Sequence, residues 1–288
     1  MPVNLTICAR TDTGLVRPTN EDSFVVADLT SGCAFHVPAV ASCVEVGERG
    51  VLLAISDGLG GHAAGEVASA LVVDSLRRSM TRSIPWDPRE VDDLVEDAAK
   101  QANRVVWNAA RRPGLERMGA TLTAVFIHGP FAHIAEVGDS RAYLLRGGTI
   151  RQVTHDQSYV QLLIDHGVAP RDAHKSPLSG MVLQAMGTKP DVKVAIGRLA
   201  LRQGDCLVLC SDGLSNKVGS AEMRASVLWS RHLDVACDGM VDLAKQRGGD
   251  DNITLILAGV GGDAPPLVAG ESIEDTFEEV REVRIDAL

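Results

Sequence analysis

The sequence has 288 residues, of which 45% are hydrophobic, and this is enough to bury one sizeable core. Its formal net charge is −10, so it lacks the strongly basic surface of a general nucleic-acid-binding protein, and we expect no nucleic-acid partner. Because no apolar run approaches the ~20 residues that span a bilayer, we expect no membrane association either.

The first half of the chain alternates apolar runs with helical patterns. Three short runs predict strands, at residues 5–10, 23–27 and 51–55. Residues 29–50 are expected to form a long hairpin or loop. Apolar residues recur at helical spacing over 64–72, and a second helix is predicted from Asp87 to about residue 109. Asp87 can cap that helix, and Pro88 suits its first position.

The second half is richer in strands. Patterns typical of strands cover residues 121–128, 131–137, 141–146, 192–199, 205–210 and 253–260. Residues 156–189 are expected to form loop and short helix, and two more helices are predicted at 221–229 and 233–246. Strands joined by hairpins, with helices in two pairs, indicate an α+β fold rather than βαβ alternation.

The charge distribution divides the chain near residue 262. Residues 263–288 contain eight acidic residues and two arginines, a net charge of −6, whereas the rest has a net charge of −4. We therefore expect one domain at 1–262 and an acidic tail at 263–288. In the tail, Ile273, Phe277 and Val280 recur at helical spacing, which indicates either a docked amphipathic helix or, as we favour, a solvated end.

The cysteines are scattered and form no CxxC pair, so we expect reduced, mostly buried thiols. No signal peptide is recognisable, which predicts a cytoplasmic protein. Cys33, His36 and Cys43 fall in the 29–50 segment and are expected to be loop residues rather than a metal site. The other histidines have no spacing suited to zinc.

Four aspartates stand where a predicted strand meets a loop. They occur in the pairs Asp57-Gly58, Gly138-Asp139, Asp212-Gly213 and Asp251-Asn252. A sheet holds such a residue rigidly while its carboxylate reaches a cleft. Carboxylates brought together repel one another unless a multivalent cation neutralises them, and ligation by oxygen alone suits Mg²⁺ or Mn²⁺.

The competing interpretation is that aspartate–glycine pairs are ordinary turn residues. Asp238-Gly239 illustrates it, because this pair lies inside a helical pattern. Turn chemistry accounts for any single pair, but not for four pairs at predicted strand ends. The set as a whole therefore predicts a metal site.

These pairs belong to an ordered series of motifs over residues 3–260. The motifs are Arg17-Pro18-Thr19-Asn20-Glu21-Asp22, Asp57-Gly58-Leu59-Gly60-Gly61-His62, Gly119-Ala120-Thr121, Val137-Gly138-Asp139-Ser140-Arg141-Ala142-Tyr143, Thr154-His155-Asp156-Gln157-Ser158, Ser211-Asp212-Gly213-Leu214 and Asp251-Asn252-Ile253-Thr254. Together they resemble the type-2C (PPM) metal-dependent serine/threonine protein phosphatases of bacterial type. The resemblance implies an αββα sandwich: two antiparallel sheets packed face to face, each covered by a pair of helices.

The resemblance also implies a binuclear Mg²⁺ or Mn²⁺ centre. In it Asp57 bridges two metals, the carbonyl of Gly58 binds one, and Asp212 and Asp251 complete the site. Asp139, together with Asp212, matches a third metal position of bacterial members.

Supporting roles follow from the same resemblance. Glu21 and Asp22 act through metal-bound waters, and Asn252 lies beside the ligands. Arg17 is the candidate phosphate clamp, because a guanidinium presents a planar fork to phosphate oxygens; the alternative is a surface arginine. His62 is either the general acid that protonates the leaving alkoxide or a residue that faces solvent.

The implied reaction is hydrolysis of phosphoserine and phosphothreonine in proteins. Two cations that share one water lower its pKa, so hydroxide is available near neutral pH to attack phosphorus in line. The implied partners are phosphorylated proteins, a Ser/Thr kinase and its substrates, and we expect a monomer. The 171–187 segment should form a flap beside the site, and its sequence differs from the family's usual basic version.

Two other functions stay open. One is a pseudophosphatase that keeps the fold as a binding module, and the presence of Asp57, Asp212 and Asp251 argues against it. The other is a phosphatase that acts on a stress-response regulator by partner switching. The complete Arg17 motif and Asp139 favour the branch that opposes a kinase.

Overall fold

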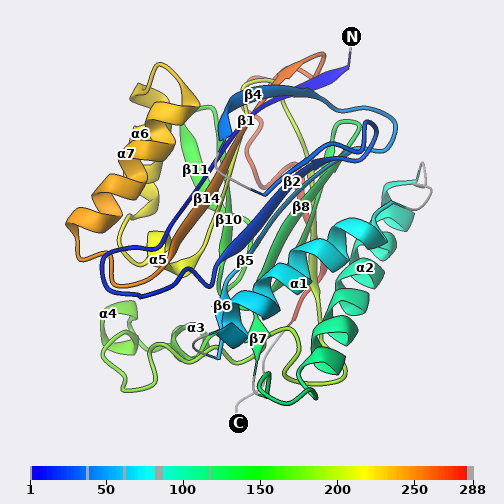
Figure 1. Cartoon of the computed structure of the whole chain (residues 1–288). Helices are drawn as coiled ribbons and strands as arrows, with labels where there is room; N and C mark the ends of the chain where they lie inside the picture. Colours follow the sequence, from blue (N-terminus) through cyan, green and yellow to red (C-terminus); the bar gives the residue numbers. More distant parts are fainter. Residues whose placement is uncertain (1, 37–38, 61–62, 82–86, 117, 284–288) are drawn as a thin grey trace.

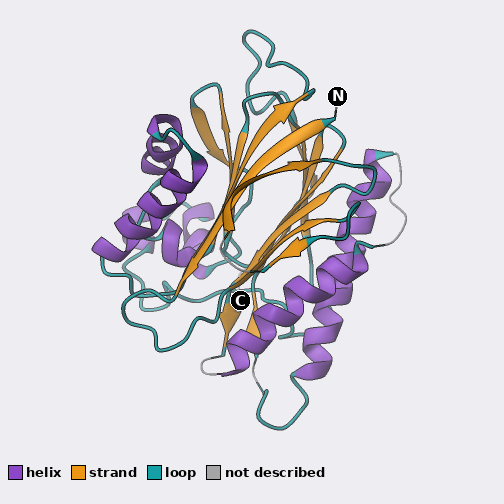
Figure 2. Cartoon of the chain, turned by 45° about the horizontal axis from the view of Figure 1, so that its top comes forward, coloured by secondary structure: helices purple, strands orange, loops and turns teal. Residues whose placement is uncertain are grey.

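The structure is a computed structural model that describes residues 2–36, 39–60, 63–81, 87–116 and 118–283. Two antiparallel sheets pack face to face, and a pair of helices covers the outer face of each (Figure 1). Viewed from another direction, the sheets form the central layers, with helices on both outer sides (Figure 2). The predicted α+β sandwich is thus confirmed.

The strands form two large sheets and one short ribbon. The six-stranded sheet has the order β11 (Thr149–Gln152), β10 (Arg141–Arg146), β13 (Cys206–Cys210), β14 (Ile253–Gly262), β1 (Val3–Asp12) and β4 (Ala39–Glu45). The seven-stranded sheet has the order β15 (Phe277–Arg281), β12 (Ala195–Ala200), β9 (Phe131–Val137), β8 (Leu122–His128), β5 (Val51–Ser56), β2 (Ser23–Asp28) and β3 (Ala34–Phe35). The ribbon pairs β6 (Gly58–Leu59) with β7 (Gly119–Ala120).

The helices divide between the two outer faces and the loops near the site. The long ones are α1 (Ala63–Ser79), α2 (Pro88–Ala109), α6 (Ser220–Trp229) and α7 (Leu233–Gln246). The short ones are α3 (Tyr159–Asp165), α4 (Pro170–Ala173) and α5 (Asp212–Ser215). Within the described ranges, no helix is both long and apolar enough to cross a membrane.

Strand β5 shows why its apolar run is continuous. Val51, Leu53 and Ile55 belong to the core between the sheets, whereas Leu52 and Ala54 belong to the core under α1 and α2. Successive side chains of a strand point to opposite faces, so a strand covered on both sides needs apolar residues at every position. This burial holds the end of β5, where Asp57 follows, in a fixed place.

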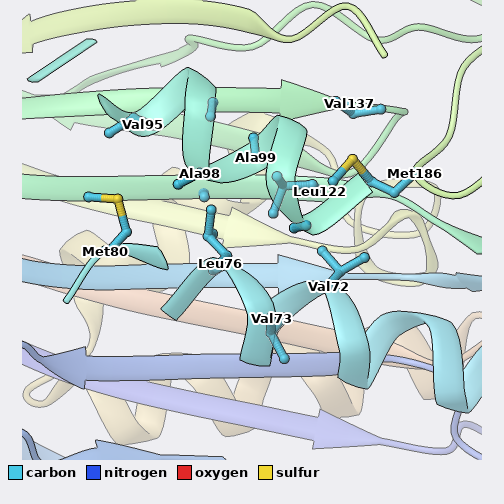
Figure 3. Close-up of a cluster of buried hydrophobic side chains, with 14 of the residues drawn as sticks. Val72, Val73, Leu76, Met80, Val95, Ala98, Ala99, Leu122, Val137 and Met186 are labelled. Carbon is cyan, nitrogen blue, oxygen red and sulfur yellow. The ribbon is translucent and has the colours of Figure 1, made fainter. Parts of the chain in front are cut away.

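Helix α2 begins at its predicted cap and covers the seven-stranded sheet. The Asp87 carboxylate accepts a hydrogen bond from the backbone N–H of Arg89 at 2.8 Å, and Pro88 takes the first helical position. Ala98 of α2 and Leu76 of α1 lie in the cluster that packs on this sheet (Figure 3). The small side chains of α2 allow the helix to approach the sheet closely.

The expectation for residues 29–50 is corrected in part. The segment contains the predicted hairpin, because β3 pairs with β2. It then crosses to the other sheet, where β4 pairs with β1 and Val44 lies opposite Leu5. Cys43 is therefore a strand residue opposite Thr6 and not a loop residue. Side chains alternate between half-buried and exposed from Ser42 to Glu45, as in a strand with one face toward solvent, and β4 is the last strand of its sheet.

The tail is also corrected, since its described part is neither a helix nor a solvated end. Strand β15 pairs with β12, with Phe277 opposite Leu199, and so extends the seven-stranded sheet. Ile273 is only 3% exposed and lies in the core between the sheets. The spacing does not reflect one helical face, because Ile273 and Phe277 pack in the core between the sheets and Val280 packs against the core under α1 and α2. Whether residues 1–262 fold as a domain on their own stays a prediction.

Arginines of the body account for the acidic composition of the tail. Three acids of the tail pair with arginines of the body: Glu271 with Arg202, Glu274 with Arg151 and Glu278 with Arg198. The Arg202 guanidinium donates to both carboxylate oxygens of Glu271 at 2.7 Å. These three acids are thus paired with arginines, although the sequence of this acidic stretch is typical of a solvated segment.

The buried position of Ile273 predicts that the tail stabilises the fold. Ile273→Ala should lower the free energy of unfolding by about 2–5 kcal/mol, because it leaves a cavity between the sheets. Urea denaturation followed by circular dichroism measures this loss. Val268→Ala is the matched control, because Val268 is 60% exposed and its substitution should cost less than about 0.5 kcal/mol. Equal stability of the Ile273→Ala variant and the parent would contradict the docked tail.

Candidate active site

The strand-end aspartates gather at one edge of the sandwich, where β6, β7 and α5 lie in Figure 1. Asp57 follows β5, Asp139 follows β9, Asp212 follows β13 and Asp251 precedes β14. All four line one pocket of about 930 Å³, although they are far apart in the sequence. Its lining also includes Arg17, Pro18, Thr19, Glu21, Gly58, Leu59, Gly60, Gly180, Val182 and Asn252.

Apart from Asp22 and His62, the predicted site residues line this pocket. Asp22 does not line the pocket but is buried beside it, 8% exposed, and accepts a hydrogen bond from the hydroxyl of Ser211 at 2.8 Å. His62 lies outside the described residues, so its role as general acid stays a prediction. The other residues predicted to bind metal or phosphate, or to support them, all face the same pocket.

Buried hydroxyl groups connect the loops that carry Asp57 and Asp139. The backbone N–H of Asp57 donates to the Thr121 hydroxyl at 2.9 Å, and the hydroxyls of Thr121 and Ser140 lie 2.8 Å apart. The carbonyl of Gly138 also accepts from the backbone N–H of Gln157 at 2.7 Å. Thr121, Ser140 and Gln157 occur in the sequence motifs, but only the structure shows that they position these loops.

Asn252 performs a similar task for the loop that precedes β2. Its side-chain nitrogen donates to the carbonyls of Thr13 and Thr19, both at 2.9 Å. Its side-chain oxygen accepts from the backbone N–H of Glu21 at 2.8 Å. One buried amide therefore holds both ends of the loop that contains Arg17.

Close packing, and not turn conformation, explains two of the aspartate–glycine pairs. A Cβ atom on Gly58 would lie 2.3 Å from the carbonyl oxygen of Gly65, and one on Gly213 would lie 2.0 Å from that of Asn252. Neither glycine has a positive φ. The glycines are thus needed so that neighbouring backbone can approach the carboxylates, which is a use of glycine other than turn formation.

The acidic side chains raise one another's pKa. Loss of hydration and then the charges of Asp212 and Asp156 raise the pKa of Asp139 to about 7, although Arg141 lowers it. Burial and the charges of Asp212 and Asp251 raise the pKa of Asp22 to about 7. The pKa of Asp57 is raised well above its ordinary value by the same two causes. The carboxylates of Asp57 and Asp139 keep some access to the pocket, whereas that of Asp22 does not. Protein atoms replace most of the water around all three.

The donor set fits a hard divalent cation. The pocket offers carboxylate and carbonyl oxygens, and it contains no sulfur or imidazole ligand among the described residues. One buried oxygen each of Asp22 and Asp212 has no hydrogen-bond partner. In the described ranges no three acidic, histidine or cysteine side chains are already arranged around a single point. A cation would therefore draw the carboxylates together from their present positions.

Arg17 contacts a predicted metal ligand. Its guanidinium donates to the Asp251 carboxylate at 2.8 Å, and the two side chains are 52% and 35% exposed. Sequence analysis assigned these residues separate roles and did not predict the ion pair. Because both are partly solvated, the pair is weak and can be exchanged for other partners.

Residues of the predicted flap lie beside this set. Gly180 and Val182 line the pocket, and an isolated bridge joins Val182 to Ser158. A neighbouring hollow of about 500 Å³ shares Asp139 and Asp212 with it. There Asp156 accepts hydrogen bonds from two nitrogens of Arg141 at 2.6 and 2.9 Å.

Comparison with known proteins gives consistent matches. A family model described as Protein phosphatase 2C matches residues 39–250. The serine/threonine protein phosphatase PstP of Mycobacterium tuberculosis is 37% identical over 92% of this chain and 48% of its own length. The serine/threonine phosphatase stp of Listeria innocua is 33% identical over 86% of this chain and 93% of its own length. The chain thus spans about half the length of the PstP relative.

A solved structure gives a similar result. The catalytic domain of PstP in complex with two manganese ions superposes with a TM-score of 0.73 at 32% identity. The superposition covers 90% of this chain and all of that one.

The raised pKa values predict that cation binding releases protons. Asp22 and Asp139, with pKa values of about 7, are largely protonated at pH 6.5, and a cation held in or beside the pocket would favour their ionised forms. Calorimetric titration with Mn²⁺ in buffers of different ionisation enthalpy should show more protons released at pH 6.5 than at pH 9, and tighter binding at the higher pH. Asp139→Asn should reduce the release. The same affinity at both pH values would contradict the assignment.

The Arg17–Asp251 pair predicts a competition between the arginine and a cation. Arg17→Gln should strengthen Mn²⁺ binding by up to about fivefold, because it frees Asp251 and removes a positive charge. Arg10→Gln is the matched control, since Arg10 pairs with Asp238, an aspartate that does not line the pocket. Weaker Mn²⁺ binding by Arg17→Gln would show that Arg17 holds Asp251 in place for the metal.

Proposed function

The chain belongs to the protein phosphatase 2C family, and we propose that it hydrolyses phosphoserine and phosphothreonine in proteins with the help of Mn²⁺ or Mg²⁺. The observation that carries the proposal is the pocket in which four strand-end carboxylates meet an arginine. Such a cluster is unfavourable without a cation, and it suits two.

Asp57, Asp212 and Asp251 are the residues that we propose for a binuclear centre. The Asp57 carboxylate and the backbone carbonyl of Gly58 would help to hold the ions. Asp139 with Asp212 would hold a third ion. When bound, the ions supply a water of lowered pKa and offset the negative charge that develops on the phosphoryl group. The solved relative with two manganese ions supports the choice of metal.

The chain's own residues orient the phosphate ester. Arg17 would leave Asp251 and present its guanidinium to the phosphate oxygens. Its exposure and its attachment to a loop held by Asn252 make this exchange a side-chain movement only. Glu21 and Asp22 would support the ions through water, and Asn252 would keep their loop in place.

Three finer parts of the proposal rest on the resemblance. His62 remains the candidate for the general acid. Opposition to a Ser/Thr kinase follows from the substrate class, since a phosphatase reverses what a kinase does. In the alternative function, the same chemistry would act on one particular phosphoprotein, which is a regulator of a stress response. A pure binding module would not need the full acidic set, which argues for an active enzyme.

The metal mechanism can be tested by substituting one proposed metal ligand and one matched control residue. Asp212→Asn should lower kcat for release of phosphate from a phosphothreonine peptide in Mn²⁺ by at least about 100-fold, because it weakens ion binding at the reacting centre. EDTA should abolish the activity of the parent. Asp238→Asn, an aspartate–glycine pair outside the pocket, should retain full activity. Robust activity in EDTA, or an unaffected Asp212→Asn variant, would refute the metal mechanism.

A further inference from the structure

Large apolar side chains are exposed on two loops that border the pocket. On the first loop, Leu15 and Val16 are 63% and 65% exposed, directly before Arg17. On the flap, Leu178 and Met181 are 48% and 42% exposed, close to Gly180. Covering apolar surface with a partner lowers the free energy. Exposed apolar side chains on two loops beside one pocket therefore indicate a contact surface.

The first loop displays its side chains from a fixed backbone. Asn252 binds the carbonyls of Thr13 and Thr19 on either side of the exposed pair. In addition, the backbone N–H of Leu15 donates to the carbonyl of Gly249 at 2.7 Å. The exposure of Leu15 and Val16 is therefore a feature of an ordered loop.

The flap turn is ordered in the same way. The backbone N–H of Met181 donates to the carbonyl of Leu178 at 2.9 Å and closes the turn. The carbonyl of Met181 accepts from the backbone N–H of Tyr159, also at 2.9 Å, which ties the turn to α3. A preformed apolar surface loses little entropy on binding and therefore contributes more to affinity than a disordered one.

Both loops also contribute to the pocket itself. Residues 17–19 of the first loop and Gly180 and Val182 of the flap are part of its lining. The exposed apolar residues lie within two positions of these lining residues in the chain. A peptide whose phosphorylated residue enters the pocket can therefore place its adjacent residues against these loops.

We propose that Leu15, Val16, Leu178 and Met181 form a docking surface for large aliphatic side chains next to the phosphorylated residue. The proposal rests on the phosphatase function and narrows its substrate class to phosphoserine or phosphothreonine flanked by leucine, isoleucine, valine or methionine. Charged flanks find no partner among these four residues, and burying a charge there is unfavourable.

A peptide panel tests the preference on the parent protein. Four phosphothreonine peptides differ only in their flanking residues, which are leucine, serine, lysine or glutamate. We expect kcat/KM in Mn²⁺ to be about tenfold higher for the leucine peptide than for the serine peptide, mainly through KM. p-Nitrophenyl phosphate, which has no flanking residues, serves as the reference substrate.

Variants then locate the preference. In Leu178→Ser/Met181→Ser and in Leu15→Ser/Val16→Ser, the ratio of kcat/KM on the leucine peptide to that on p-nitrophenyl phosphate should fall at least about threefold. Leu228→Ser/Val235→Ser is the matched control, since these residues are 46% and 55% exposed on α6 and α7. Its ratio should equal that of the parent. Thermal unfolding checks that every variant is folded.

The outcomes separate this inference from the function on which it rests. Equal kcat/KM on the leucine and serine peptides, with p-nitrophenyl phosphate still hydrolysed, would overturn the docking surface alone. An equal fall of the ratio in the control variant would overturn it as well. If the parent hydrolyses neither p-nitrophenyl phosphate nor any peptide in Mn²⁺, the phosphatase function fails, and the inference fails with it.

Discussion

Repulsion among carboxylates removed from water is the constraint on which the rest of the structure depends. Asp57 interacts unfavourably with Asp22, Asp139, Asp212 and Asp251, and each of these acids sits at the end or the start of a strand. In the absence of a cation such a cluster destabilises the fold, because its members are either protonated or unfavourably charged. Packing of the two sheets and of the cores around them offsets this destabilisation, because it holds the strand ends in place whatever the charge of the acids.

Neutral polar groups then position the acids without adding further charge. The paired hydroxyls of Thr121 and Ser140 and the buried amide of Asn252 connect loops that come from different sheets. Ser211 does the same for Asp22. A cluster held by cations or basic residues alone would lose its shape with each change of ligand. Hydroxyl and amide groups would keep the loops in register when a cation binds or Arg17 changes partner.

The parts of the fold that sequence analysis predicted are those governed by local pattern. The two-faced apolar run of β5, the Asp87 cap and the aspartates at strand ends are legible within a few residues. The parts it missed depend on distant partners. Strand β15 pairs with β12 some 80 residues earlier in the chain, and its acids bind arginines that no local pattern identifies. The Arg17–Asp251 pair joins residues 234 positions apart, and the motifs assign both residues to other ligands.

Chemistry and selectivity therefore reside in different kinds of structure. The strand ends that carry the carboxylates are held by the cores, so a cation would draw the carboxylates together by side-chain movement and not by movement of the sheets. The apolar residues at the rim are held by backbone hydrogen bonds, and their side chains are largely exposed. With the proposed docking surface, substitution at Leu178 or Met181 would change which segment of a phosphoprotein binds without disturbing the strand ends. A family that shares one metal chemistry can in this way serve different phosphoproteins, because the loops that select the substrate carry little of the stability.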